Sequence, residues 1–161
     1  MALSAGDTIP DVTIMTMGSN GPSPVQSGSV LGTGTVVLFG VPGAFTPACS
    51  DQHLPGYIAL AEQLKSKGVD TVACIAVNDA FVMDAWGDAR QTGDAILLLA
   101  DGNADFAKAA GLELDGSGFG LGTRFQRFAA IIENGTVRDI GVEDVPTNVT
   151  VSSAESVLQK L

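Results

Sequence analysis

The chain has 161 residues, 45% of them hydrophobic, a formal net charge of −10 and two cysteines. This length allows one domain with a substantial core, and two cysteines cannot form the disulfide framework of a small secreted protein. The negative charge argues against binding to nucleic acid or anionic membranes, and apolar runs such as "TVVLFGV" are too short to span a bilayer. We therefore expect a single domain over residues 1–161, located in the cytoplasm or, after removal of a transit peptide, in an organelle.

The first part of the chain predicts a strand, a turn and a helix. The segment from Gly18 to Thr35 is rich in Gly, Ser and Pro, which indicates loops around a short N-terminal hairpin. The near-continuous apolar run at 35–40 is typical of a strand buried on both faces. A helix over 49–67 follows and ends at Gly68, with an apolar face formed by Leu54, Ile58, Ala61 and Leu64.

The middle of the chain alternates strands and helices. Two further apolar runs predict buried strands over 71–77 and 96–100. The helix after the first of these strands is capped by Asn78 or Asp79 and has an apolar face of Phe81, Val82 and Trp86. A short helix over 105–110 follows the second strand.

The C-terminal third predicts a hairpin and a helix. Asn-Gly at 134–135 is the strongest short hairpin signal, and it joins strands over 127–132 and 136–142. Ser152 precedes Glu155 by three residues and forms a capping box for the last helix. Alternating strands and helices before an antiparallel pair imply an α/β fold of the thioredoxin-like class, a mixed central sheet with helices on both faces.

The turn between the strand at 35–40 and the helix at 49–67 leads to the most reactive group of the chain. Cys49 stands where a strand gives way to a helix, and the backbone N–H groups and dipole of a first helical turn favour a thiolate. Pro42 and Pro47 each fix a backbone dihedral, so the loop holds one shape. The Thr46 hydroxyl can donate and accept hydrogen bonds. These features suit a nucleophilic sulfur that meets a substrate with two adjacent oxygens.

The pattern Pro42-x-x-x-Thr46-x-x-Cys49 resembles the peroxiredoxin active-site motif. The wider string "FGVPGAFTPACSDQHLPG" is similar to the type II, peroxiredoxin-5-like subfamily, and the resemblance continues through "VNDAFVMDAWG", "LLADGNADFAKAAGLELD" and "GLGTRFQRFA". It implies a thiol peroxidase that reduces hydrogen peroxide and alkyl hydroperoxides through a sulfenic acid on Cys49. Arg127 would complete the site, Thr46 would help to hold the peroxide oxygens, and Pro42 would shield the sulfur. No metal, haem or nucleotide cofactor is implied.

Cys74 has two readings. It lies in the middle of an apolar strand, which is typical of a small buried core residue. Plant type II relatives carry a cysteine at the matching position, described as the resolving one, and we favour that role. A Cys49–Cys74 disulfide needs α-carbons within about 7 Å. We expect the start of a helix and the centre of a neighbouring strand to lie farther apart than this, so the first helical turn would have to unwind.

The resemblance also implies partners for the chain. Glutaredoxin with glutathione, or thioredoxin, would reduce the oxidised cysteine, and a homodimer would use the loop around Phe45. Trp86 is assigned to the core or to a subunit contact. Arg124 lies three residues from Arg127 in an extended segment, so we expect it on the opposite face in a structural ion pair.

Two other functions compete with a peroxidase. A cysteine hydrolase or acyl transferase would need His53, the only histidine, as a base, but it lies one helical turn after Cys49 and lacks an orienting partner in the sequence. A Cys49–His53 metal site lacks further ligands. A non-catalytic thioredoxin-like binding or redox-sensing module is the main alternative, and the absence of Cys-x-x-Cys argues against thioredoxin itself.

Overall fold

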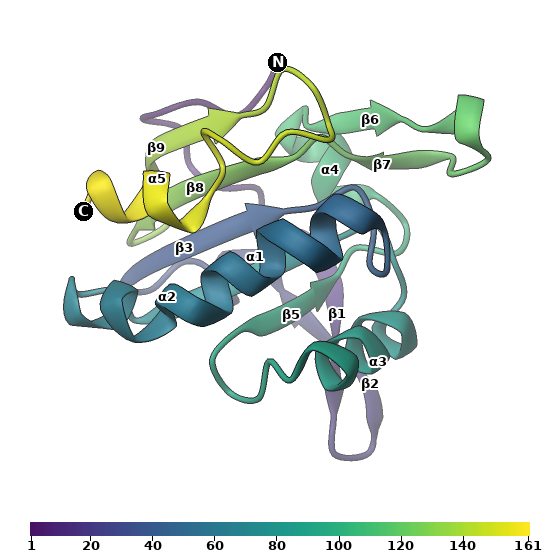
Figure 1. Ribbon diagram of the computed structural model, residues 1–161, viewed down its shortest axis with the longest axis horizontal. Helices are drawn as coiled ribbons and strands as arrows, with labels where there is room; N and C mark the ends of the chain where they lie inside the picture. Colours follow the sequence, from purple (N-terminus) through teal and green to yellow (C-terminus); the bar gives the residue numbers. More distant parts are fainter.

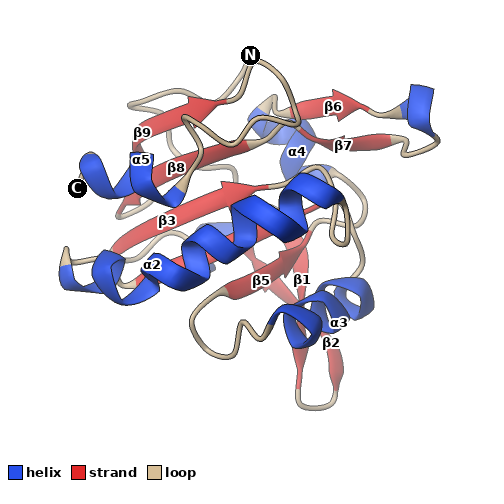
Figure 2. Cartoon of the chain, in the orientation of Figure 1, coloured by secondary structure: helices blue, strands red, loops and turns tan.

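A mixed seven-stranded sheet forms the centre of the protein, in a computed structural model that describes residues 1–161 (Figures 1 and 2). Its order is β2-β1-β5-β4-β3-β8-β9. The pairs β3–β4 and β4–β5 are parallel, and all the other pairs are antiparallel. The strands are β1 (Thr13–Gly18), β2 (Gly21–Gln26), β3 (Thr35–Gly40), β4 (Thr71–Ala76), β5 (Leu97–Ala100), β8 (Phe128–Glu133) and β9 (Thr136–Val142).

Helices cover both faces of this sheet, as the sequence predicted. Figure 1 shows α2 and α3 in front of the strands and α4 behind them. No helix is both long and apolar enough to cross a lipid bilayer. The helices are α1 (Ser27–Val30), α2 (Leu54–Ser66), α3 (Ala80–Arg90), α4 (Asp105–Ala110) and α5 (Ala154–Gln159), together with short turns at Cys49–His53 and Ser117–Phe119.

The apolar strands are buried on both faces because each contributes to two core layers. In β3, Val37 and Phe39 pack in the layer that contains the buried sides of α2, α3 and α5. Val36 and Leu38 pack in the opposite layer, with α4. Successive strand residues point to opposite faces, so a strand covered by helices on both sides has no polar positions.

The predicted N-terminal hairpin is present as β1 and β2. Its second strand lies inside the segment rich in Gly, Ser and Pro and contains Pro22 and Pro24. Proline has no backbone N–H, so it is tolerated only where a strand has no neighbour on one side. β2 occupies such a position at the end of the strand order.

Two local predictions were wrong. Phe81, predicted on the apolar face of α3, is 65% exposed, because Ala80, Met83 and Gly87 share the buried side of the helix with Trp86, which is buried as predicted. Ser152 does not cap the last helix. Ser153 does so, and its side chain accepts from the Ser156 amide.

Ser152 instead donates hydrogen bonds to a buried carboxylate, that of Glu143. Its amide and hydroxyl both donate to Glu143, at 2.8 and 2.6 Å, and the amide and hydroxyl of Thr150 do the same at 2.8 and 2.7 Å. Burial raises the pKa of the Glu143 carboxyl, but these hydrogen bonds together outweigh it and lower the pKa. The segment from 143 to 152 is therefore closed into a tied loop, here called the Glu143 loop.

A small second sheet was not predicted. Strands β6 (Glu113–Asp115) and β7 (Thr123–Phe125) pair antiparallel and project beyond the main sheet at the upper right of Figure 1. The turn between them carries Phe119, whose side chain is 90% exposed. Strands of three residues leave too short a pattern for periodicity to reveal.

Candidate active site

Cys49 lies in a π-helical turn, Cys49–His53, that runs directly into α2. The predicted helix over 49–67 is therefore present, but its first turn is wider than an α-helical one. Such turns are rare and occur often at functional sites. The turn buries Cys49 completely and also buries Ser50 and His53.

Arg127 contacts the sulfur. Its Nη2 donates to Cys49 Sγ at 3.0 Å, its Nη1 donates to His53 Nδ1 at 2.8 Å, and its Nε donates to the carbonyl of Pro146 at 2.8 Å. Only 2% of Arg127 is exposed, and it has no carboxylate within salt-bridge distance. A permanent positive charge beside a thiol favours its thiolate form.

The loop before Cys49 is fixed by hydrogen bonds from several elements. The Ala44 amide donates to Asn78 Oδ1 at 3.0 Å, and the Thr46 hydroxyl donates to the Gly43 carbonyl at 2.7 Å. Because that hydroxyl proton is already used, the Thr46 oxygen is left as an acceptor for an incoming O–H group. Phe45 has a left-handed φ of 64° and is 55% exposed, as expected for this loop.

The ion pair expected for Arg124 was wrong. Its Nη1 donates to the carbonyls of Val77 at 3.2 Å and Pro42 at 3.5 Å, and its Nε donates to the Leu121 carbonyl at 3.0 Å. The opposite-face prediction assumed one continuous strand, but β7 of the small sheet ends at Phe125 and β8 of the large sheet begins at Phe128. Arg124 therefore reaches the loop that precedes Cys49, and Arg127 reaches Cys49 itself.

A cavity of about 470 Å³ opens above this site. It reaches Arg127, but the sulfur itself lies below the cavity floor, since Cys49 has no exposed surface. A small molecule entering the cavity meets Thr46 and Arg127 before it meets the sulfur. The cavity is lined by Pro42, Thr46, Pro47, Ala48, Asp51, Gln52, Leu114, Asp115, Gly116, Phe119, Leu121, Arg127, Pro146 and Thr147.

Cys74 lies on the same face of the sheet as Cys49. Both belong to the core layer under α2, both are fully buried, and both are free thiols. Burial, and then the nearby charge at Cys49, raises the pKa of the Cys74 thiol well above its usual value. Cys74 is therefore a neutral thiol in this arrangement.

His53 has no nitrogen free to act as a base. Its Nδ1 accepts from Arg127, so the ring proton is on Nε2, which donates to the Ser152 carbonyl at 2.9 Å. Burial, and then the charge of Arg127, lowers the pKa of His53 to about 3. This occupancy argues against the hydrolase alternative. No group of three His, Cys, Asp or Glu side chains is placed to hold a metal ion.

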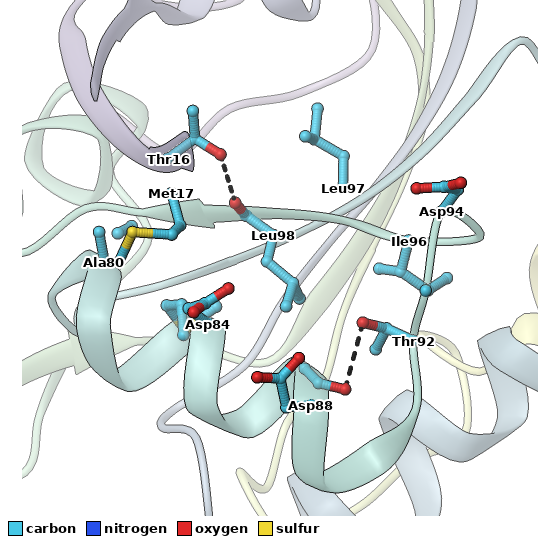
Figure 3. Close-up of a pocket in the computed structure, with 14 residues that line it drawn as sticks. Thr16, Met17, Ala80, Asp84, Asp88, Thr92, Asp94, Ile96, Leu97 and Leu98 are labelled. Atoms are coloured by element: carbon cyan, nitrogen blue, oxygen red, sulfur yellow. Dashed lines mark hydrogen bonds between the residues drawn. The ribbon is translucent and has the colours of Figure 1, made fainter. Parts of the chain in front are cut away.

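A second cavity, of about 370 Å³, lies between α3 and strands β1 and β5 (Figure 3). Figure 3 shows carboxylates of Asp84, Asp88 and Asp94 around it. The hydroxyls of Thr16 and Thr92 that line it are bonded to backbone carbonyls. None of the site residues predicted from the sequence lines this cavity.

A buried thiol held against a guanidinium, at the start of a helix on a thioredoxin-like sheet, defines a thiol-dependent redox enzyme. Comparison with known proteins gives the family. The Redoxin family matches residues 4–158. Peroxiredoxin-2D of Arabidopsis thaliana is 45% identical over 99% of this chain and 98% of its own length. The chloroplastic peroxiredoxin-2E of the same plant is 43% identical, over 99% and 70%.

Solved structures agree with the sequence comparison. Reduced Prx3 of Vibrio vulnificus, in complex with hydrogen peroxide, superposes with a TM-score of 0.93 at 50% identity, with 98% of each chain covered. The chain therefore belongs to the redoxin family and, within it, to the type II peroxiredoxins. It is a thiol-dependent peroxidase that acts on peroxides and is recycled by thiol reductants.

Proposed function

We propose that Cys49 is the peroxidatic cysteine and that Arg127, Thr46 and Pro42 complete its site. The Cys49 thiolate attacks the terminal oxygen of a hydroperoxide, an S–O bond forms as the O–O bond breaks, and the sulfur is oxidised to a sulfenic acid. The departing oxygen takes up a proton and leaves as water or an alcohol. The single observation that carries this proposal is the 3.0 Å contact between Arg127 Nη2 and Cys49 Sγ.

The neighbouring groups suit the two peroxide oxygens. The Arg127 guanidinium stabilises the negative charge that grows on the departing oxygen. The Thr46 oxygen, with its own proton committed to Gly43, accepts the O–H of the peroxide and orients it. Pro42 lines the cavity above the sulfur and limits the entry of water. Hydrogen peroxide bound to the Vibrio relative supports this substrate class, with alkyl hydroperoxides as the larger members.

Recycling needs a second thiol. We assign the resolving role to Cys74, because it lies in the same core layer as Cys49 and close enough to feel its charge. Glutaredoxin with glutathione, or thioredoxin, then reduces the product, and their relative rates in a coupled assay distinguish them. If Cys74 does not react, glutathione attacks the sulfenic acid directly.

The proposal also covers the oligomeric state of the protein and its cellular compartment. We expect a homodimer that covers the exposed Phe45 loop, and a single domain over residues 1–161. Two free thiols fit a reducing compartment such as the cytoplasm. The relatives include chloroplastic proteins and others without that designation.

A stopped-flow assay with hydrogen peroxide and an alkyl hydroperoxide tests the function. Cys49→Ser abolishes peroxide consumption, and Arg127→Ala lowers its second-order rate constant about 100-fold, because the charge at the reacting oxygens is lost. Arg138→Ala is the matched control, since that arginine pairs with Glu133 at the surface, 43% exposed. A Cys49→Ser protein as fast as the wild type would eliminate the peroxidase function.

A further inference from the structure

Arg127 needs more than its charge to act at Cys49. Its side chain has several rotatable bonds, so the direction of Nη2 is set only by what the other guanidinium nitrogens contact. Nε is held by the Pro146 carbonyl and Nη1 by His53 Nδ1, both at 2.8 Å. These two acceptors fix the plane of the guanidinium, and the remaining nitrogen then points at the sulfur.

The His53 acceptor is part of the same turn as the sulfur. Cys49 and His53 are the first and last residues of the π-helical turn, and the Arg127 nitrogens Nη1 and Nη2 bridge the two side chains. One element thus presents both the reacting atom and the group that aims the guanidinium. A displacement of the turn would move both together.

The His53 ring is fixed in turn by its surroundings. It packs against the rings of Phe39 and Tyr57, with centroids 5.0 and 5.6 Å away. Its Nε2–H donates to the Ser152 carbonyl, which the Glu143 loop holds in place. This bond selects the tautomer that leaves Nδ1 as an acceptor.

A satisfied core histidine is the simpler explanation, and the contacts argue against it. The Ser152 carbonyl already accepts a hydrogen bond from the Tyr57 hydroxyl at 2.8 Å, so it has a donor even without His53. Arg127 Nη1, by contrast, has no other hydrogen-bond acceptor and no carboxylate nearby. A buried charged donor without an acceptor is costly, so Arg127 would turn to find one.

We propose that His53 is a positioning residue for the peroxidase reaction, a neutral imidazole whose Nδ1 orients Arg127 toward the Cys49 sulfur. This inference rests on the proposed function of Cys49 and Arg127. The ring neither accepts a substrate proton nor touches the peroxide.

Two substitutions separate positioning from packing. His53→Phe keeps a ring against Phe39 and Tyr57 but removes the acceptor, so the peroxidase rate constant falls about 10- to 100-fold through misplacement of Arg127. His53→Asn offers an amide oxygen near the position of Nδ1 and restores most of the rate. Tyr57→Phe is the matched control, because it removes the other bond to Ser152 and leaves Arg127 untouched.

A second measurement does not depend on turnover. The rate of alkylation of Cys49 by iodoacetamide at pH 7 reports the reactivity of the sulfur beside Arg127, and it falls in His53→Phe, while His53→Asn and Tyr57→Phe follow the wild type. A His53→Phe protein with the wild-type peroxidase and alkylation rates would overturn the proposal. A wild-type protein that does not consume peroxide would refute the proposed function instead. The alkylation comparison would still test whether His53 positions Arg127.

The tautomer can be read without any substitution. Nitrogen-15 NMR of the wild-type imidazole at pH 5 is expected to show a neutral ring with its proton on Nε2 and a bond from Arg127 to Nδ1. A charged ring, or one with its proton on Nδ1, would contradict the proposal even if His53→Phe failed to fold.

Discussion

At the scale of single residues, the buried neutral His53 makes folding sensitive to acid. The pKa of His53 is lowered to about 3 from its ordinary value of 6.5, so between these pH values the unfolded chain binds a proton that the folded chain does not bind. Stability is therefore lost as pH falls below about 6.5. The charge of Arg127 adds to the effect of burial, whereas the hydrogen bond to the Ser152 carbonyl and the charge of Glu143 oppose it in part.

The size of this loss can be measured against a variant that does not titrate. From pH 6.5 to pH 4.5 the wild type should lose roughly 2 to 3 kcal/mol in its free energy of unfolding beyond what His53→Asn loses, at ~1.4 kcal/mol per pH unit. Urea unfolding of both proteins at pH 6.5 and pH 4.5 gives the comparison. Equal losses in the two proteins would show that His53 does not titrate on unfolding over this range.

The sequence alone pointed to the residues proposed for the reaction, but it could not point to the residues that hold them in place. Cys49, Thr46 and Pro42 share one short motif, and the family resemblance pointed to Arg127. The contacts of His53, Arg124 and Asn78 join segments far apart in the chain, so no local pattern marks them. Their roles depend on which backbone carbonyls and side chains the fold brings within reach.

At the scale of elements, strands and helices with a strong periodic pattern were predicted closely. The bounds of β3 and α4 agree with prediction to the residue, because each is a clear apolar or amphipathic segment with a distinct end. The π-helical geometry of the Cys49 turn and the small β6–β7 sheet were missed. Both are set by tertiary packing rather than by spacing of apolar residues.

The Cys49 turn is tied to α3 by one hydrogen bond that can report its movement. Trp86 Nε1 donates to Ser50 Oγ at 3.0 Å, and Trp86 is the only tryptophan in the chain. A disulfide between Cys49 and Cys74 would pull Cys49 away from Arg127 and displace Ser50 with it. The environment of the indole would change at that step.

Oxidation with one equivalent of hydrogen peroxide should therefore change Trp86 fluorescence in two phases. The slower phase accompanies formation of an intramolecular disulfide and is absent in Cys74→Ser, which retains a sulfenic acid detectable by mass spectrometry. Cys74→Ser is itself the matched control, since it removes the second thiol without touching the Trp86 bond. A wild-type protein that stops at the sulfenic acid would assign Cys74 to the core alone.

At the scale of the whole molecule, the proposed homodimer depends on the exposed aromatic residue of the active-site loop. Phe45 is 55% exposed next to Thr46, an unusual position for a large apolar side chain. Phe45→Glu should shift the protein from dimer to monomer in sedimentation velocity, because it places a charge in the contact. Gln63→Glu adds the same charge on the exposed side of α2 and should leave the dimer intact. A wild type that sediments as a monomer would contradict the assembly.

The prolines of β2 limit how such copies can meet. Pro22 and Pro24 stand at alternate positions of an outermost strand and remove two N–H donors that an additional strand would need. Pairing of two molecules edge to edge along β2 is therefore disfavoured. The N-terminal hairpin thus limits aggregation through this edge, while contact through the Phe45 loop does not involve it.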